Sequence, residues 1–294
     1  MPSYLRFIII FLSQHRKMSM HHSDSPTSDS PTSDPYQVPA NLVQPLWLRS
    51  RESLVDNGLV YDPIAANACR RCALAQDCLT GDIAQKQLLH VTLTQLCDQQ
   101  VRHFLDTHPD GWIINVGAGL DTRFYRVDNG RCHWIEWDIT ENLLWREKLF
   151  HRSERYQLVC GDVMQPQGLA ELPIPEFAPV LLVCEHALLD CDAQQVARFV
   201  RSIGLHFAKA SACLVVAGDK TSSYLGQKLG CEAYAHGFTC AGDAIINCLP
   251  WAKSVRTFSP LDRHCDRWKF WQRAIARSGI YKTRLTPVVV NLDW

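Results

Sequence analysis

The stretch that decides the fold is Trp112-Ile113-Ile114-Asn115-Val116-Gly117-Ala118-Gly119-Leu120-Asp121-Thr122-Arg123. Its first five residues form a short, almost continuous apolar run, which is typical of a strand buried on both faces. The run leads directly into two glycines, whose missing side chains let the backbone approach a ligand closely. The stretch therefore predicts a buried strand with a ligand-binding loop at its carboxyl end.

Four further apolar runs follow the first, at residues 132–137, 156–160, 180–184 and 214–217. Helical patterns lie between them, for example the stretch that reaches Phe150 and the one that carries Val196, Phe199, Val200 and Ile203. Strands that alternate with helices indicate a parallel sheet with right-handed crossovers. We therefore predict an α/β fold with a doubly wound, mostly parallel sheet.

The residues ahead of Trp112 carry helical patterns only. Asp62-Pro63 is typical of a helix start, and residues 82–106 form a long amphipathic pattern. We expect a helical cap over residues 38–110 and a ligand-binding domain over residues 111–294. Residues 1–37 contain Ser-Asp-Ser-Pro-Thr repeats that cannot bury enough apolar surface to fold, so we expect a disordered tail, or a start codon assigned upstream of Met18 or Met20.

Charge and hydropathy exclude several classes of protein. The 294 residues include 30 Lys+Arg and 30 Asp+Glu, so the formal net charge is zero. A binder of nucleic acid or of an anionic membrane surface would carry a basic excess. No apolar stretch reaches the ~18–20 residues that a membrane-spanning helix needs. We expect neither a nucleic acid nor a membrane partner.

The 13 cysteines are odd in number and scattered singly through apolar segments. This usage is typical of reduced thiols in a cytosolic protein, so we expect a cytoplasmic location. Cys69, Cys72 and Cys78 form a local cluster without a second Cys or His pair at matching spacing. We therefore expect a buried helical face there and no metal site.

Acidic residues follow four of the predicted strands: Asp121, Asp138, Asp162 and Glu185. Because the carboxyl ends of parallel strands share one edge, these acids would repel each other unless a cationic or polyhydroxylated ligand lay among them. A dinucleotide loop needs a third glycine where this chain has Thr122. S-adenosylmethionine has ribose hydroxyls, a positive sulfonium and no phosphate, so it suits the acidic edge better.

The stretch from Asn115 to Arg126 resembles the signature of the leucine carboxyl methyltransferase family, which includes the tetracenomycin-type O-methyltransferases. Trp137-Asp138, Gly161-Asp162-Val163 and Tyr61-Asp62-Pro63 are similar to family motifs as well. The resemblance runs from about Asn41 to the C-terminus. It implies a class I methyltransferase with a seven-stranded sheet, an N-terminal helical cap, and methyl transfer from S-adenosylmethionine to oxygen.

The resemblance also implies roles for individual residues. Asp138 would hold the ribose, Asp162 and Val163 would meet the adenine, Glu185 would lie near the methionine ammonium, and Arg51 would bind its carboxylate. Gly117 and Gly119 would line the methionine moiety, and Ala118, Asp121 and Ile139 complete the predicted cofactor set. An ion pair between Asp121 and Arg123 that braces the glycine loop is an equal alternative for Asp121.

Three residues depart from the family pattern near the reaction centre. Leu93 replaces an arginine, His186 a glycine, and Asp190 a tyrosine. His186 and Asp190 are the predicted catalytic residues, because a hydroxyl acceptor benefits from a base whereas a carboxylate needs none. A hydrogen-bonded scaffold role for His186 is the alternative.

The function we expect is S-adenosylmethionine-dependent O-methylation of a small molecule, at a polyketide-type hydroxyl or a carboxylate. Alternatives are carboxyl methylation at a protein C-terminus, a non-catalytic binding protein of the same fold, and a nicotinamide dehydrogenase, which Thr122 disfavours.

Overall fold

The computed structural model describes residues 35–73 and 80–294. Residues 1–34 of the expected tail, and Cys78 of the local cysteine cluster, lie outside the described residues. Cys69 is the half-buried last residue of helix α3 (Pro63–Cys69), whereas Cys72 lies beyond the end of that helix, in a β-bridge with Tyr36. Cys72 is buried and donates a hydrogen bond to the backbone oxygen of Ala68, but it is not on the helical face that the sequence led us to expect.

The described chain forms a seven-stranded sheet in the order β3-β2-β1-β4-β5-β7-β6. The strands are β1 (Trp112–Val116), β2 (His133–Asp138), β3 (Tyr156–Cys160), β4 (Val180–Cys184), β5 (Ser211–Val216), β6 (Ser254–Phe258) and β7 (Val288–Asp293). The first five pair in parallel, whereas β7 runs antiparallel between β5 and β6. The predicted mostly parallel, doubly wound sheet is confirmed.

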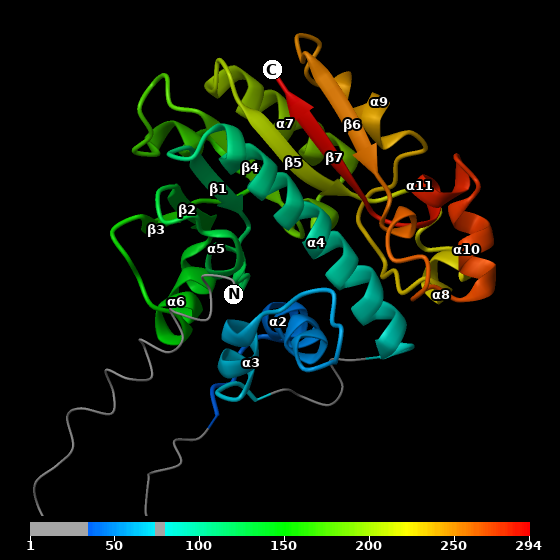
Figure 1. Ribbon diagram of the computed structural model, residues 1–294. Coiled ribbons are helices and arrows are strands. Elements are labelled where there is room, and N and C mark those ends of the chain that lie inside the picture. Colours follow the sequence, from blue (N-terminus) through cyan, green and yellow to red (C-terminus); the bar gives the residue numbers. More distant parts are fainter. Residues whose placement is uncertain (1–34, 74–79) are drawn as a thin grey trace, which may run out of the picture. The chain divides into compact units, whose positions relative to one another are not determined.

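Helices cover both faces of this sheet (Figure 1). The helices of the described chain are α2 (Ala40–Ser53), α3 (Pro63–Cys69), α4 (Ile83–Thr107), α5 (Arg123–Val127), α6 (Thr140–Leu149), α7 (Ala193–His206), α8 (Tyr224–Lys228), α9 (Ala241–Ile246), α10 (Phe270–Ala276) and α11 (Tyr281–Leu285), with 3-10 turns η2 (Pro166–Glu171), η3 (Ala187–Asp190) and η4 (Pro260–Asp262). The long helix α4 crosses one face diagonally and contacts β4, β5 and β7.

Alternation along the strands divides the core into a layer on each face of the sheet. Ile114 of β1 joins a cluster with α7 residues such as Phe199, whereas the adjacent Ile113 joins a cluster with α4 residues such as Val101. Successive side chains of a strand point to opposite faces, so one apolar run supplies both layers. This double burial explains why the first strand contains almost no polar residues.

The start of α3 follows the predicted pattern. Pro63 is its first residue, and the Asp62 carboxylate accepts a hydrogen bond from the backbone N–H of Ala65 at 2.9 Å. A side-chain acceptor satisfies one of the donors that a helix start leaves unpaired. Helix α3 packs on α2, and α2 in turn contacts α4.

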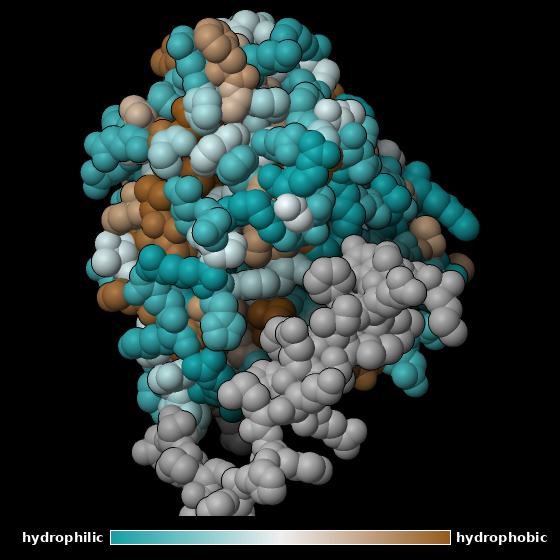
Figure 2. All heavy atoms as spheres, turned by 60° about the vertical axis from the view of Figure 1, so that its left-hand side comes forward, coloured by the Kyte–Doolittle hydropathy of each residue, from teal (hydrophilic) through white to brown (hydrophobic). Residues whose placement is uncertain are grey.

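None of the described helices has both the length and the apolar content to cross a membrane. The face of the molecule in Figure 2 is largely hydrophilic, with hydrophobic residues gathered in small groups between polar ones.

Helix α7 offers a test of local stability, because it begins in a capping box. The Asp192 carboxylate accepts from the backbone N–H groups of Gln194 and Gln195, both at 2.8 Å, and the Gln195 side chain accepts from the backbone N–H of Asp192 at 2.6 Å. Asp192→Ala should lower the free energy of unfolding by about 1 kcal/mol in urea denaturation followed by circular dichroism. Asp192→Asn keeps an acceptor and should lose less; an unchanged Asp192→Ala protein would contradict the assigned role.

Candidate active site

A cleft lies beyond the carboxyl ends of the central strands, where the strand order reverses between β1 and β4. Its volume is about 150 Å³. It is lined by residues of α2, the loop after β1, the end of β2, the first turn of α6, and η3 with its N-cap: Asn41, Leu42, Pro45, Arg49, Gly117, Ala118, Gly119, Leu120, Asp121, Asp138, Asn142, His186, Ala187 and Asp190. The structure thus brings together five of the predicted cofactor residues and both predicted catalytic residues.

The loop after β1 requires its two glycines. Gly117 and Gly119 have φ angles of +60° and +47°, a backbone region that residues with side chains rarely adopt. A Cβ atom on Gly117 would lie 2.2 Å from the Cβ of Ala187. The loop therefore passes tightly under η3 and leaves its own backbone open to the cleft.

Asp138 fastens this loop to the end of β2. One carboxylate oxygen accepts from the backbone N–H of Gly119 at 2.6 Å. The other accepts from the backbone N–H of Ile139 at 2.7 Å and from the Asn142 amide at 3.0 Å. Burial outweighs these hydrogen bonds and raises the pKa of Asp138 above its ordinary value. Its remaining acceptor capacity faces the cleft, which is suited to a hydroxyl donor.

Of the two residues expected to meet the adenine, only Asp162 lines a surface hollow, which is separate from the cleft. Ile139 of the predicted cofactor set lines the same hollow with Cys160 and Gly161, and Asp162 accepts from the backbone N–H of Met164 at 2.8 Å. Val163 packs against the apolar core and is not among the residues that line this hollow.

The structure does not place Arg51 with the other predicted cofactor residues. Arg51 is exposed, and its guanidinium lies over the Trp47 ring at 4.9 Å from the centroid. Arg49 lines the cleft instead. Two residues along an α-helix correspond to a rotation of about 200°, so the two arginines point to nearly opposite sides of α2. The sequence prediction is corrected on this point: Arg49 is the α2 arginine at the cleft.

Arg49 is buried and held from several directions. Its Nε donates to Asp62 at 3.3 Å and its Nη2 to the backbone oxygen of Leu120 at 2.9 Å. Its Nη1 lies 3.5 Å from Nε2 of His90. Because arginine has no acceptor, any hydrogen bond between them uses the His90 lone pair.

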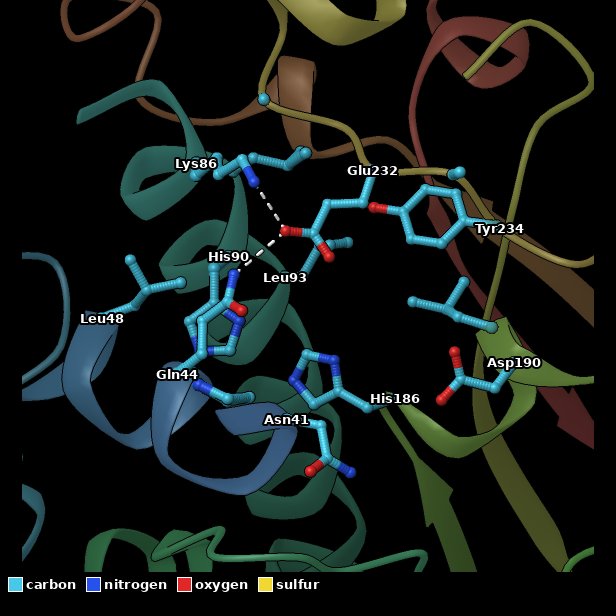
Figure 3. A pocket seen from close by; sticks show the side chains of 15 residues that line it. Asn41, Gln44, Leu48, Lys86, His90, Leu93, His186, Asp190, Glu232 and Tyr234 are labelled. Atoms are coloured by element: carbon cyan, nitrogen blue, oxygen red, sulfur yellow. Dashed lines mark hydrogen bonds and ion pairs between the residues drawn. The ribbon is translucent and has the colours of Figure 1, made fainter. Parts of the chain in front are cut away.

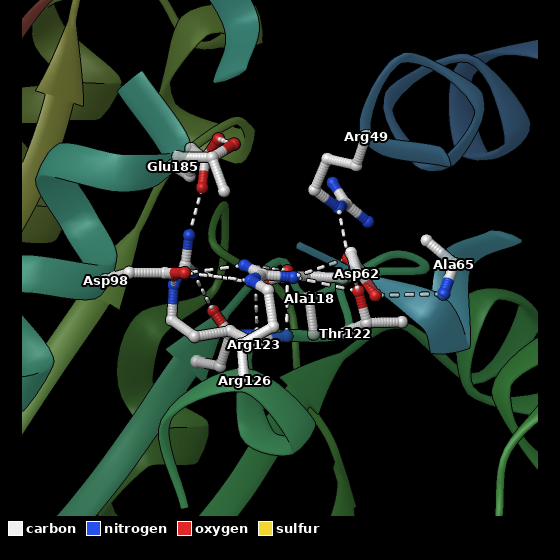
Figure 4. A network of polar contacts seen from close by, with 12 residues as sticks. Arg49, Asp62, Ala65, Asp98, Ala118, Thr122, Arg123, Arg126 and Glu185 are labelled. Carbon is white, nitrogen blue, oxygen red and sulfur yellow. Dashed lines mark hydrogen bonds and ion pairs between the residues drawn. The ribbon is translucent and has the colours of Figure 1, made fainter. Parts of the chain in front are cut away.

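Beneath the glycine loop, the fully buried guanidinium of Arg123 is surrounded by carboxylates from three parts of the chain (Figure 4). It pairs with Asp98 of α4 at 2.8 Å, with Asp121 of the loop at 2.7 Å, and with Glu185 at the end of β4. Arg126 also pairs with Asp98, at 2.8 Å, and with Asp121, at 3.3 Å. The sequence alternative of an Asp121–Arg123 ion pair is therefore present, within a larger network.

The network sets the charge of its acids. Burial opposes ionisation of Glu185, but Arg123 outweighs it and holds the pKa of Glu185 well below the ordinary range. The same balance of burial against Arg123 and Arg126 lowers the pKa of Asp121. Glu185 is not among the residues that line the cleft, since its carboxylate is engaged by Arg123 and by the Thr94 hydroxyl at 2.6 Å.

His186 lies between this network and the cleft. Its Nε2 is 3.4 Å from a Glu185 oxygen, and its ring stacks on His90 with centroids 5.1 Å apart. His90, Glu185 and His186 are the one group among the described residues whose ligand atoms lie close enough for a metal, within 4.8 Å. Guanidinium groups already face two of the three, Arg49 at His90 and Arg123 at Glu185, and would repel a metal cation.

A second cavity of about 210 Å³ adjoins the cleft and shares Asn41, Pro45, His186 and Asp190 with it (Figure 3). The other residues that line it are Gln44, Leu48, Lys86, Leu89, His90, Leu93, Leu189, Gly230, Glu232, Ala233 and Tyr234. Leu93, one of the departures from the family pattern, contributes to its apolar wall. Nothing in the sequence pattern distinguished Glu232 and Tyr234, because they come from a loop that only the fold brings here.

Comparison with solved structures assigns the class of fold. A candidate methyltransferase from Thermobifida fusca aligns with 86% of this chain and 96% of its own, with a TM-score of 0.54 and 13% identity. A DUF574-family protein from Streptomyces avermitilis aligns with 84% of this chain and 96% of its own, with a TM-score of 0.53 and 10% identity. The fold is that of the class I methyltransferases.

One named protein is similar to this chain in sequence as well. The tetracenomycin polyketide synthesis O-methyltransferase TcmP of Streptomyces glaucescens is 27% identical over 107 residues, which are 35% of this chain. The match confirms the predicted resemblance to the tetracenomycin-type O-methyltransferases. The aligned segment spans 39% of the relative's length. No protein-family model matches the chain.

The buried network gives a stability prediction with a pH dependence. Arg123→Met leaves the buried Glu185 without an arginine partner and leaves Asp98 and Asp121 with Arg126 alone, so it should lower the free energy of unfolding at pH 7 by about 3–5 kcal/mol. Because the folded-state pKa values of Asp121 and Glu185 are depressed, the network contributes fully above about pH 4 and loses its contribution as the pH falls further. The difference between variant and parent should therefore shrink on acidification.

The measurement is urea denaturation across a pH series. Arg155→Met is the matched control, because Arg155 pairs with Asp128 at 2.7 Å near the surface, and its removal should cost at most about 1 kcal/mol. Equal losses in the two variants would contradict the central role of Arg123.

Proposed function

We propose that the protein is an S-adenosylmethionine-dependent O-methyltransferase that acts on a small molecule. The observation that carries the proposal is the glycine loop fastened to Asp138 at the switch point of the sheet. The confirmed fold and the resemblance to a polyketide O-methyltransferase support it.

The residues of the cleft fit this cofactor. Asp138 would accept hydrogen bonds from the ribose hydroxyls, and Gly117 and Gly119 would let the methionine moiety lie against the backbone. Ile139 and Asp162 would border the adenine in the surface hollow that they share. When bound, S-adenosylmethionine supplies an activated methyl group on a positive sulfonium.

Arg49 takes the role that the sequence suggested for Arg51. Its guanidinium lies at the cleft, and a guanidinium can bind a carboxylate through two parallel hydrogen bonds. Arg49 would therefore hold the methionine carboxylate from α2. The family resemblance suggested that Glu185 lies near the methionine ammonium. Because its carboxylate is 3.4 Å from Nε2 of His186, Glu185 would instead orient the His186 ring.

His186 and Asp190 are the catalytic candidates, because both line the cleft and the second cavity. An acceptor in that cavity would lie beside them. His186 can take a proton from a hydroxyl acceptor, and the carboxylate of Glu185 at 3.4 Å would stabilise the charged ring. The chain's main task is to hold the acceptor oxygen in line with the methyl group.

A non-catalytic binding protein remains the alternative function. The second cavity, which adjoins the cleft, favours an enzyme. A protein that only binds the cofactor has no need of a second site beside His186 and Asp190. Methyl transfer to any acceptor, detected by mass spectrometry, separates the two.

The ribose assignment predicts the effect of one substitution. Asp138→Ala should weaken S-adenosylhomocysteine binding by at least about 100-fold in isothermal titration calorimetry, because charge-assisted hydrogen bonds to both ribose hydroxyls are lost. The control is Asp110→Ala, at an exposed residue that pairs with Arg131. Unchanged affinity in a folded Asp138→Ala protein would refute the assignment.

The two arginines of α2 form a matched pair. Arg49→Met should weaken S-adenosylhomocysteine binding about tenfold or more, whereas Arg51→Met should leave it unchanged. Methylthioadenosine, which lacks the amino-acid end, is the control ligand in the same titrations, and its affinity should not change in either variant. If Arg49→Met weakened both ligands equally, Arg49 would shape the cleft without binding the carboxylate.

A further inference from the structure

We propose that Arg146 of α6 is a positioning residue for the cofactor, because it holds the glycine loop (residues 117–121) in the conformation that leaves the loop open to the cleft. The inference rests on the proposed function and adds to it a residue that does not itself line the cleft. The sequence motifs pointed to neither Arg146 nor its partner Glu136.

The contacts of Arg146 with the loop are all to its backbone. Nη1 donates to the carbonyl oxygens of Gly119 and Asp121, both at 2.8 Å, and to that of Ala118 at 3.4 Å. A buried carbonyl group that has left the hydrogen-bond ladder of the sheet needs another donor. A single guanidinium supplies that donor to three carbonyls of the loop from inside the protein.

These contacts determine which way the loop faces. The carbonyl of Gly119 is turned to Arg146, and the backbone N–H of the same residue donates to Asp138 at 2.6 Å. A segment with two glycines has many accessible backbone conformations, so contacts with the rest of the protein must select one of them. Arg146 and Asp138 together select the conformation of Gly119, one through its carbonyl and the other through its N–H.

Arg146 is itself firmly anchored. Its side chain is 1% exposed, its Nη2 donates to the fully buried Glu136 at 2.7 Å, and its Nε donates to the Tyr156 hydroxyl at 3.2 Å. A buried ion pair need not be more stabilising than well-packed apolar side chains in its place. What an apolar side chain at position 146 could not supply is the set of donors to the loop.

Asn115 connects this arginine to the Arg123 network. It is the one polar residue of β1, and its Nδ2 donates to Glu136 at 2.8 Å and to Asp121 at 3.2 Å. The carboxylate of Asp121 pairs with Arg123, whereas the backbone carbonyl of Asp121 accepts from Arg146. The loop is therefore held by two buried arginines, one through a side chain and the other through the backbone.

Helix α6 also borders the other parts of the proposed cofactor site. Asn142 lies one turn before Arg146, lines the cleft and donates to Asp138 at 3.0 Å. Thr140 and Glu141, in the first turn of the helix, line the surface hollow proposed for the adenine. One helix thus contacts the proposed adenine, ribose and methionine sites, and Arg146 is its contact with the last of them.

Arg146→Lys tests the inference. Lysine keeps a charge opposite Glu136, but a single ammonium group cannot reproduce the planar fork of donors. We expect S-adenosylhomocysteine to bind about tenfold more weakly or worse in isothermal titration calorimetry, because a loop with more conformations must be ordered by the ligand. Hydrogen–deuterium exchange without ligand should be faster in residues 117–121, where the parent protects the Gly119 N–H.

Tyr156→Phe is the matched control, because it removes another buried partner of Arg146 and leaves the donors to the loop in place. Both variants should melt at a lower temperature than the parent, as measured by circular dichroism. The control should keep its S-adenosylhomocysteine affinity and its loop exchange within about twofold of the parent. The comparison separates positioning of the loop from general stability.

A double variant covers the case in which Arg146→Lys does not fold. Arg146→Gln combined with Glu136→Gln removes both charges together, so that no unpaired carboxylate is left at position 136. One amide cannot supply the loop with the donors of a guanidinium. We expect the same weaker binding of S-adenosylhomocysteine and the same faster exchange in residues 117–121.

Parent-like affinity in a folded Arg146 variant would overturn the inference, as would an equal loss of affinity in Tyr156→Phe. Unchanged exchange of residues 117–121 in the Arg146 variants would overturn it as well. The titration of the parent protein reports separately on the proposed function. If the parent does not bind S-adenosylhomocysteine, that function fails, whereas the exchange measurement without ligand still decides whether Arg146 holds the loop.

Discussion

The candidate active site depends on one ion-pair cluster, the buried Arg123 guanidinium and its three carboxylates. Asp98 comes from α4, Asp121 from the glycine loop, and Glu185 from the end of β4. Fully desolvated charges are tolerated in a protein only when each has a partner. Because the partners are far apart in the sequence, the cluster fixes the loop, the helix and the strand relative to each other at the edge where the ligand would lie.

This cluster also changes what the acidic edge can do. Four acids after four strands suggest a strongly negative site, but Arg123 and Arg126 neutralise Asp121 and Glu185. Asp138 is left as the buried acid that faces the cleft, held by backbone N–H groups rather than by a cation. The negative charge of the cleft is thereby concentrated at Asp138, where the proposed ribose hydroxyls would bind.

The sequence patterns predicted much of the fold, because the formation of a strand or a helix depends largely on residues that are close to each other along the chain. Strands β1, β3 and β4 have the predicted bounds, since each is a short apolar run; β1 and β4 are almost fully buried, whereas β3 is a half-buried strand at one edge of the sheet. Strands β6 and β7 were not recognised from their own patterns. Strand β6 lies at the edge of the sheet opposite β3, and its Arg256 and Thr257 are exposed, so it carries little apolar signal. The family resemblance supplied the count of seven strands that the pattern did not.

The sequence by itself determined the sheet, the glycine loop after β1 and Asp138 after β2, because strand burial and strand-end position follow from neighbours along the chain. Only the tertiary structure decided that Arg49 and not Arg51 lies at the cleft, that Glu185 is engaged by Arg123, and that Glu232 meets Lys86 across the second cavity. The physical reason is that an ion pair forms between charges that lie close together in space, however far apart they are in the sequence. Residues separated by 62 and 146 positions come into contact only after the helices have packed on the sheet.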